Sequence, residues 1–572
     1  MKRTVLVSLL LTLALPAVTP KRSASFAFAR WQTGSTPDFP AIDANALMDH
    51  IKVLSSDRFE GRAPGSRGED LTIRYIEDQF RKHGLGAGNV DGSYLQEVPM
   101  VGLTPEPTIT LLFKKDSEEA RLNYLADFVA WTRRVVPTTS LNNSPLLFVG
   151  YGVQAPEFDW DDYKGVDVRG RTLVMLVNDP PVPDPGDPAR LDPRVFGGDM
   201  MTYYGRWTYK FDIGAAKGAA GILLVHETGP AGYPWSVVES FGGERFDLLA
   251  PDRNMGKASL EGWISLDQAR KMFAMAGQDF ESLKKQAARR SFRPVALAVT
   301  VSADLHNQIR DLESHNVLAK LEGSDPQLKG ECLVYTAHWD HFGIGQPVDG
   351  DRIYHGAVDN ASGVAGLIEI GGAFAKRPER PKRSILFLAT TGEEQGLIGA
   401  EYYVANPVFP LAKTLAVINL DGLNVYGRTK DVTLIGLGNS ELDDYARRAA
   451  SAQGREVRAD PDPEKGLFYR SDHFSFVKRG VPALDPASGI QYVGKPADFG
   501  RNIRGEYTAR DYHKPSDKVK SGWDLGGMIE DLQLLWMVGY QVASADRYPE
   551  WNTASEFKAT RDAQLKAAGA HQ

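Results

Sequence analysis

The sequence predicts an α/β fold, because apolar strand-like runs alternate with helical patterns and polar residues follow the runs. CLVYTAH (332–338), SILFLAT (384–390) and TLAVIN (414–419) are short, rich in apolar and β-branched residues, and bounded by turn residues. Such runs are typical of buried strands. A helical pattern over 362–376 separates the first two. In an open α/β sheet, ligands gather at the carboxyl ends of the strands. We therefore expect a functional crevice there.

Acidic and histidine residues stand at or just after these predicted strand ends, or in the glycine-rich turn between the first two. The side chains expected in the crevice are His338, Asp340, Asp359, Glu393, Glu394 and Asp421, joined by the later His513. Zinc takes imidazole and carboxylate ligands at about 2.0–2.2 Å and keeps one position open in catalytic sites. If Asp340 and Glu393 are set aside, five of these side chains remain as ligands. Five are too many for one zinc but suit two ions that share a carboxylate. This pattern predicts a metal hydrolase.

Two further residues complete the expected chemistry. Glu393 stands beside Glu394, so one carboxylate can bind metal while its neighbour accepts the proton of a water molecule. Asp340, two residues after His338, can hold the other ring nitrogen of that imidazole. The sequence has no HExxH motif, which excludes the commonest single-zinc protease design.

Each residue also has a simpler interpretation when it is taken alone. Asp359 can be the N-cap of the helix that follows it. Glu393 and Glu394 can be a solvated pair at a helix start, where the macrodipole favours acids. His513 can be a surface loop residue. The joint occurrence of these residues at successive strand ends favours the metal site.

Five separated motifs occur in a characteristic order. They are His338-Trp339-Asp340, Asp359-Asn360-Ala361-Ser362-Gly363, Glu393-Glu394, Asn419-Leu420-Asp421 and Tyr512-His513-Lys514-Pro515-Ser516-Asp517. Over residues 300–545 the sequence thereby resembles the co-catalytic dizinc aminopeptidases of the zinc exopeptidase clan. The resemblance implies a zinc-exopeptidase-like mixed β-sheet flanked by helices, two Zn²⁺ per chain and peptide substrates.

The resemblance also assigns roles to the matching positions. It implies that His338 and Asp421 bind one zinc, that Glu394 and His513 bind the other, and that Asp359 bridges them. Glu393 matches the base that activates a metal-bridging water, and Asp340 matches the partner of His338. Near the substrate pocket it places Asp472 and His473, either in contact with substrate or in support of neighbouring groups, and Tyr492 is expected to line the same cleft.

The expected activity is hydrolysis of N-terminal residues from peptides. A dizinc carboxypeptidase of the same clan would use the same ligands, and the arginines Arg470, Arg501 and Arg504 leave that alternative open. Glutaminyl cyclases resemble this scaffold but work with one zinc, and the complete ligand set favours a peptidase. A non-catalytic binding protein on this scaffold would usually lack ligands, and none is missing here.

Near residue 125 the sequence changes to short strand-like runs and glycine-rich turns, and near residue 290 the strand-like runs become longer again. This pattern predicts an inserted module. FVGYGV, FDWDDYKGVDVRGRTLVMLV and GAAGILLVHE resemble a protease-associated domain, a β-rich module without chemistry of its own. PVALAVTVSA and NVLAKLEG then predict two strands that begin the larger domain. The predicted boundaries are 30–125 for the N-terminal part of the peptidase domain, 126–290 for the insert, 291–548 for the zinc peptidase domain and 549–572 for a polar, fraying tail.

Residues 1–29 resemble an export signal, because Lys2 and Arg3 precede an apolar run that is followed by Ala27-Phe28-Ala29. We expect an exported protein, periplasmic or extracellular, that is not stably inserted in a membrane once the signal is removed. An uncleaved anchor is the alternative.

Charge and cysteine content add two exclusions. The net charge of −7 and the lack of basic blocks give no support for nucleic-acid binding. Cys332 is the only cysteine, so no intramolecular disulfide forms, and its place in a predicted buried strand indicates an inert thiol. The sequence leaves the oligomeric state open.

Overall fold

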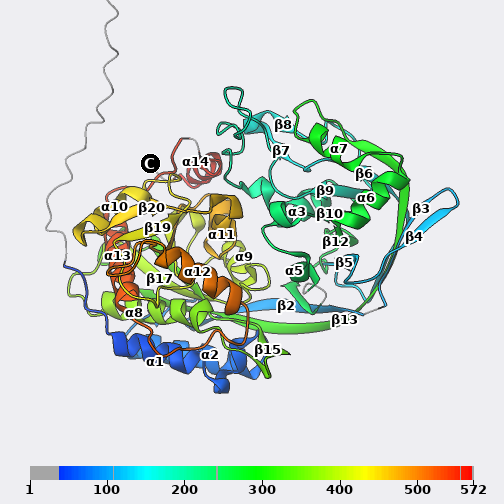
Figure 1. Ribbon diagram of the computed structural model, residues 1–572. Coiled ribbons are helices and arrows are strands. Elements are labelled where there is room, and N and C mark those ends of the chain that lie inside the picture. Colours follow the sequence, from blue (N-terminus) through cyan, green and yellow to red (C-terminus); the bar gives the residue numbers. More distant parts are fainter. Residues whose placement is uncertain (1–37, 107, 240–242, 554, 570–572) are drawn as a thin grey trace, which may run out of the picture. The chain divides into compact units, whose positions relative to one another are not determined.

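The computed structural model describes residues 38–106, 108–239, 243–553 and 555–569 (Figure 1). Its main sheet has a parallel centre in the order β17 (Ser384–Thr390), β14 (Cys332–His338), β18 (Thr414–Asn419) and β21 (Ala483–Ser488). Antiparallel strands extend it at both sides: β13 (Val295–Leu321) pairs with β17, and β19 (Asp431–Ile435) pairs with β21. The prediction of an α/β fold with a mixed sheet flanked by helices is confirmed.

Both faces of the main sheet are covered, so its central strands are buried along their whole length. Every residue of β14 and β17 is buried. Since side chains alternate across a strand, one set packs under helices α8 (Gly363–Ala375) and α13 (Gly526–Ser544), and the other packs under α9 (Ile398–Ala405) and α11 (His473–Lys478). This explains why the sequence shows continuous apolar runs rather than alternation.

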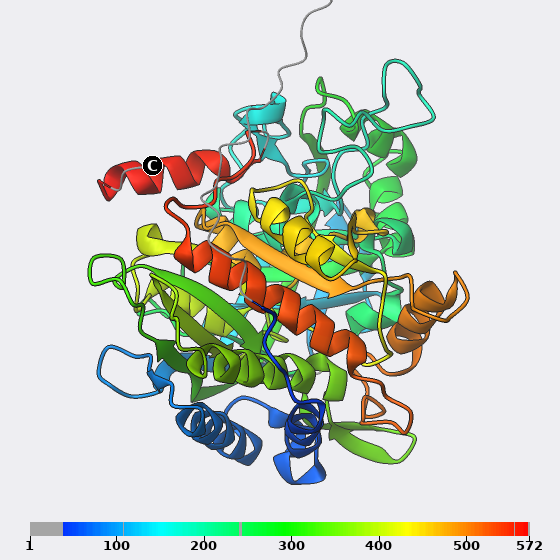
Figure 2. The same ribbon diagram turned by 90° about the vertical axis from the view of Figure 1, so that its left-hand side faces the viewer.

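Two N-terminal helices widen the layer that contains α8. Helices α1 (Ala44–Leu54) and α2 (Arg67–Lys82) both contact α8 and share its hydrophobic cluster. In Figure 2 the orange-red α13 and the green α8 lie in front of the sheet, with the blue α1 and α2 next to α8. Ser66 caps α2, because its side chain accepts hydrogen bonds from the N–H groups of Gly68 and Glu69.

A single strand of 27 residues, β13, joins the main sheet to a second sheet (Figure 1). The prediction of two separate strands in this region is wrong, because Val295–His306 pair with β6 (Thr138–Phe148) and the chain continues, without a turn, to pair with β2 (Leu95–Pro105) and β17. The second sheet also contains β3 (Thr110–Lys115), β4 (Glu118–Arg121), β5 (Phe128–Trp131), β9 (Thr172–Leu176), β10 (Gly221–His226) and β12 (Leu260–Ser265).

Helices also cover the second sheet, which has its own apolar clusters. The helices of this region are α3 (Trp207–Ala216), α4 (Thr228–Ala231), α5 (Trp235–Glu239), α6 (Leu266–Met275) and α7 (Phe280–Ala287). The predicted domain boundaries and the protease-associated character of this region stay predictions.

The remaining elements are short or lie at the periphery. They are β1 (Gly86–Ala87), β7 (Gln154–Ala155), β8 (Trp160–Asp161), β11 (Arg245–Leu248), β15 (Gly343–Val348), β16 (Asp351–Tyr354), β20 (Glu456–Ala459), α10 (Leu442–Ala452), α12 (Phe499–Arg510) and α14 (Lys558–Ala567). The described part of the predicted C-terminal tail contains α14. There the buried Arg561 donates hydrogen bonds to the carbonyl oxygens of Leu411 and Thr414, at 2.9 and 2.7 Å.

Candidate active site

The carboxyl ends of the parallel strands bring His338, Asp359 and Asp421 together. His338 is the last residue of β14, Asp421 follows β18 by two residues, and Asp359 lies in the helical turn Ala357–Ser362 that leads into α8. Nε2 of His338 lies 3.1 Å from Oδ1 of Asp359 and 3.3 Å from Oδ1 of Asp421. Nε2 of His338 therefore lies within 3.3 Å of an oxygen of each of these two carboxylates.

A second triplet shares Asp359 with the first. Nε2 of His513 lies 3.4 Å from Oδ2 of Asp359 and 3.2 Å from Oε2 of Glu394. Glu394 comes from the turn after β17, which Gly392 allows because its φ is +63°. His513 also has a positive φ of +57°, a costly conformation for a residue other than glycine and one that is frequent at functional sites. Asp359 thus offers one oxygen to each histidine.

The spacing of the donor atoms fits zinc. Tetrahedral zinc with bonds of about 2.0–2.2 Å places neighbouring ligand atoms about 3.3–3.6 Å apart, close to the distances found in both triplets. Nε2 of His338 is buried without a hydrogen-bond partner, although burying an unpaired polar atom costs free energy. A metal ion would satisfy this nitrogen.

The histidines and carboxylates of the site also shift one another's pKa values. Burial lowers the pKa of His513, but the charges of Glu394 and Asp359 outweigh burial and raise that pKa to about 10. Burial raises the pKa of Glu394, but His513 and His341 outweigh it and lower that pKa to about 2. Glu394 is thus stabilised in its ionised form, the form that binds a divalent cation, whereas His513 must give up its proton to bind one.

Three residues without an individual role in the sequence analysis hold the ligands in place. Nδ1 of His341 lies 2.5 Å from Oε1 of Glu394. Ser471 Oγ donates a hydrogen bond of 2.7 Å to Oδ2 of Asp421. Asp517 accepts hydrogen bonds of 3.1 Å from the N–H groups of Val358 and Asp359. The sequence signal for His341 was its place directly after the His338-Trp339-Asp340 motif.

Asp340 contacts both His338 and the Glu393 segment, but with different atoms. Its backbone carbonyl oxygen lies 3.1 Å from Nδ1 of His338, whereas its carboxylate lies 3.7 Å from that nitrogen. The carboxylate instead accepts a hydrogen bond of 3.1 Å from the N–H of Glu393. Asp340 therefore fixes the ring of His338 through its backbone and the turn after β17 through its side chain.

Glu393 reaches the same centre without joining either triplet. Its Oε2 lies 4.0 Å from Nε2 of His338. Burial, reinforced by the charges of Asp421 and Glu394, raises the pKa of Glu393 well above its ordinary value. A carboxyl group that retains a proton readily is suited to proton transfer.

The residues predicted near substrate are buried. Asp472 accepts a hydrogen bond from Oγ1 of Thr390 and is fully buried. His473 is also fully buried and lies edge-on to Phe468 at 5.0 Å between ring centroids. Tyr492 donates a hydrogen bond of 3.1 Å to Oδ1 of Asn424. Their part in substrate binding stays a prediction.

Arg62 is a buried cation beneath the site, in the loop between α1 and α2. Its guanidinium donates four hydrogen bonds of 2.7–2.9 Å to the carbonyl oxygens of Leu54, Trp339, His355 and Gly356. Burial lowers the pKa of Arg62 to about 10, against the opposing charges of Asp517 and Asp340. The group therefore ties the N-terminal loop to the segments around the metal ligands.

Comparisons with known proteins fit this geometry. Residues 316–537 match the model of Peptidase family M28. A vacuolar membrane protease of Tuber melanosporum is 29% identical over 181 residues, which are 31% of this chain and 17% of that protein. Aminopeptidase NAALADL1 of Mus musculus is 34% identical over 208 residues, 35% of this chain and 24% of that protein. The matches thus span a quarter or less of each relative.

The fold is shared with a solved structure, the aminopeptidase from Aneurinibacillus sp. strain AM-1. The TM-score is 0.50 at 18% identity, with 87% of this chain and 94% of that chain covered. This likeness shows the fold.

The comparisons contradict the predicted periplasmic or extracellular location. Fungal relatives, among them those of Tuber melanosporum and Kluyveromyces lactis, are named vacuolar membrane proteases. The prediction is wrong on that finding, because a basic and apolar N-terminal pattern suggests entry into an export route without fixing the final compartment. The predicted signal itself lies outside the described residues. In the described parts of the chain, no helix combines the length and apolarity needed to cross a membrane.

Proposed function

We propose that this chain, whose residues 316–537 match Peptidase family M28, is a two-zinc aminopeptidase whose metal ligands are the two triplets around Asp359. One observation carries the proposal. The two oxygens of Asp359 lie 3.1 and 3.4 Å from the Nε2 atoms of His338 and His513, respectively. A carboxylate placed between two imidazoles in this way suits a bridge between two ions.

Each group of the chain then has a defined task. When bound, the zinc ions supply a Lewis acid that polarises the scissile carbonyl and lowers the pKa of a water molecule. Glu393 accepts the proton of that water and returns it to the leaving amine. His341 and Ser471 hold the carboxylates of Glu394 and Asp421, and Asp517 holds the backbone at Asp359, which limits reorganisation during the reaction.

A dizinc carboxypeptidase is the second candidate, and two arginines favour it. The Nε atoms of Arg206 and Arg470 are buried without hydrogen-bond partners, and neither arginine forms an ion pair in the described part of the chain. Burial, and next the charge of Arg470, lower the pKa of Arg206 to about 9. Arg470 directly precedes Ser471, which bonds Asp421. Two unpaired cations beside the site suit a carboxylate of the substrate.

Aromatic packing explains how Arg206 comes near Arg470. The ring of Tyr203 lies 4.9 Å from that of Phe474 and 6.2 Å from that of Tyr469. The N–H of Met201 donates a hydrogen bond of 3.2 Å to the carbonyl oxygen of Pro463. The segment before α3 is thereby held against the segment before α11.

Two peptide series separate the candidates. One series has a free N-terminus and a blocked C-terminus, and the other has the reverse. Cleavage of the first series alone, with about two zinc ions needed for activity and loss of activity with a chelator, is the result expected. Cleavage of the second series alone would replace the aminopeptidase by the carboxypeptidase. No cleavage of either series by the zinc-loaded protein would overturn both.

A further inference from the structure

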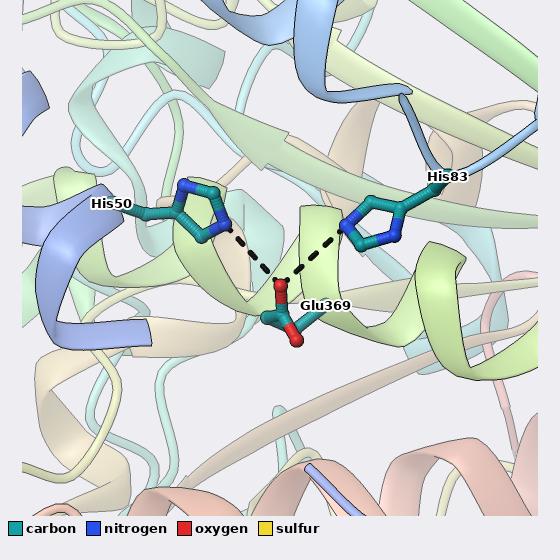
Figure 3. Close-up of side chains that lie close together, drawn as sticks. All are labelled: His50, His83 and Glu369. Atoms are coloured by element: carbon teal, nitrogen blue, oxygen red, sulfur yellow. Dashed lines mark hydrogen bonds and ion pairs between the residues drawn. The ribbon is translucent and has the colours of Figure 1, made fainter. Parts of the chain in front are cut away.

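A second group of metal-ligating atoms lies between the helices α1, α2 and α8. His50 belongs to α1, His83 follows the last residue of α2, and Glu369 lies in the middle of α8. Figure 3 shows both imidazoles pointing at one carboxylate oxygen of Glu369. Nε2 of His50 lies 3.2 Å from Oε1 of Glu369, and Nε2 of His83 lies 3.5 Å from the same atom.

These distances have the size of ligand–ligand separations around zinc. Bonds of about 2.0–2.2 Å in a tetrahedron place ligand atoms about 3.3–3.6 Å apart. In the described parts of the chain, two groups bring at least three ligand atoms of histidine, cysteine or acid within 4.8 Å of one another. One is His338, Asp359 and Glu394, in the candidate active site, and the other is His50, His83 and Glu369. The two groups share no residue.

The surroundings orient these side chains as in protein zinc sites. Nδ1 of His50 lies 2.7 Å from the hydroxyl of Tyr75, and a ligating histidine normally engages its other ring nitrogen in this way. Gly372 makes room for the second imidazole, because a Cβ atom at that position would lie 2.6 Å from Nδ1 of His83. His50 and Glu369 are buried, whereas the side chain of His83 is 16% exposed and leaves a route for an ion and water.

The charge of Glu369 also suits a cation. Its carboxylate lies in a largely apolar surrounding of α1, α2 and α8. A buried carboxylate needs a counter-charge or several hydrogen bonds.

We propose that His50, His83 and Glu369 bind a zinc ion through the two Nε2 atoms and Oε1, with solvent at the remaining position, and that this ion links the three helices. The site is separate from the candidate active site. Its ligands come from three different segments, so binding stabilises the folded chain, in which alone they meet.

The alternative is a hydrogen-bonded clamp without metal. In that arrangement Nε2 of His50 carries a hydrogen atom and donates a hydrogen bond to Glu369, while Nδ1 accepts a hydrogen bond from the hydroxyl of Tyr75. In the zinc form Nε2 carries no hydrogen atom, and Nδ1 donates a hydrogen bond to the hydroxyl of Tyr75. A tyrosine hydroxyl can act as donor or as acceptor, so it suits both arrangements. The two arrangements share one geometry and differ in whether zinc affects stability.

The test uses the whole protein, stripped with a chelator and then titrated with Zn²⁺ or Co²⁺. The variants are His83→Gln and Glu369→Gln, and His306→Gln, an exposed histidine on β13, is the matched control. The wild type and the control are expected to bind one metal ion per chain more than His83→Gln and Glu369→Gln. The Co²⁺ spectra of His83→Gln and Glu369→Gln should lack the tetrahedral absorption that this additional ion gives in the wild type and the control.

Thermal unfolding adds an independent readout. Zinc should raise the Tm of the wild type by more than it raises the Tm of His83→Gln. The reason is that zinc bound at this site stabilises the folded state, and the variant has lost one of its ligands. Peptidase activity should be the same in both. Equal metal content and an equal zinc-dependent rise in Tm in wild type and both variants would overturn the proposal. Since the test counts ions lost with His83, its result does not depend on the peptidase assignment.

Discussion

Nδ1 of His341 lies 2.5 Å from Oε1 of Glu394, while Oε2 of the same carboxylate lies 3.2 Å from Nε2 of His513. Glu394 is therefore held on one side by the protein and faces the candidate metal centre with the other. Such outer contacts set the orientation and the basicity of a ligand. His341 therefore positions Glu394, although it is not itself one of the candidate ligands.

Replacing His341 with Ala should weaken metal binding at the second triplet by about 10–100-fold, the usual cost of removing such a contact. Competition with a chromogenic chelator measures the change. His306→Ala, at an exposed position on β13, is the control and should bind as the wild type does. An unchanged affinity in His341→Ala would show that the bond to Glu394 does not prepare the ligand.

Replacing Glu393 with Gln should lower turnover by about 10²–10⁴-fold, because the amide cannot accept the proton of water. Metal content should stay at the wild-type value, since Glu393 lies outside both ligand triplets. Steady-state kinetics and metal analysis on the same preparation check both points. Glu379→Gln, whose side chain is 82% exposed, is the control. Wild-type turnover in Glu393→Gln would remove Glu393 as the base.

Replacing Arg62 with Lys should destabilise the protein by at least about 3 kcal/mol, because an ammonium group cannot serve four carbonyl oxygens in the geometry of a guanidinium. Urea denaturation of both proteins, read as the midpoint and slope of unfolding, measures the loss. Arg67→Lys, at a position where the side chain is 62% exposed, should change stability little. If both variants unfold at the wild-type midpoint, Arg62 does not hold the loop.

His315, which belongs to neither candidate metal site, predicts a pH dependence of stability. A hydrogen bond of 3.0 Å between Nδ1 of His315 and Oε1 of Glu69 raises the pKa of His315 above its ordinary 6.5. A raised pKa means that the protonated form is favoured in the folded state. The contribution is therefore complete below pH 6.5 and is lost as pH rises through the higher folded pKa.

The measurement compares the free energy of unfolding of the wild type with that of His315→Gln across this window. The advantage of the wild type should shrink as pH rises above 6.5, because the imidazolium loses its proton in both states. A difference between the two proteins that stays constant from pH 6 to alkaline pH would contradict the raised pKa.

Several parts of the fold were predictable because they depend on local pattern. The runs 332–338, 384–390 and 414–419 coincide with β14, β17 and β18, since strands buried on both faces need continuous apolar residues. The helical pattern at 362–376 likewise corresponds to α8. Parallel strands end at the same edge of a sheet, so the residues after these runs were expected to meet.

The sequence by itself therefore determined the strand ends beside which His338, Glu394 and Asp421 lie, and their role as ligands stays a prediction. Only the tertiary structure decided that β13 is one strand shared by two sheets, and that His341 bonds Glu394. It alone also brought His50 to Glu369, 319 residues away. Apolar periodicity records which face of an element is buried, whereas such contacts depend on how separate elements pack, and no local pattern encodes that packing.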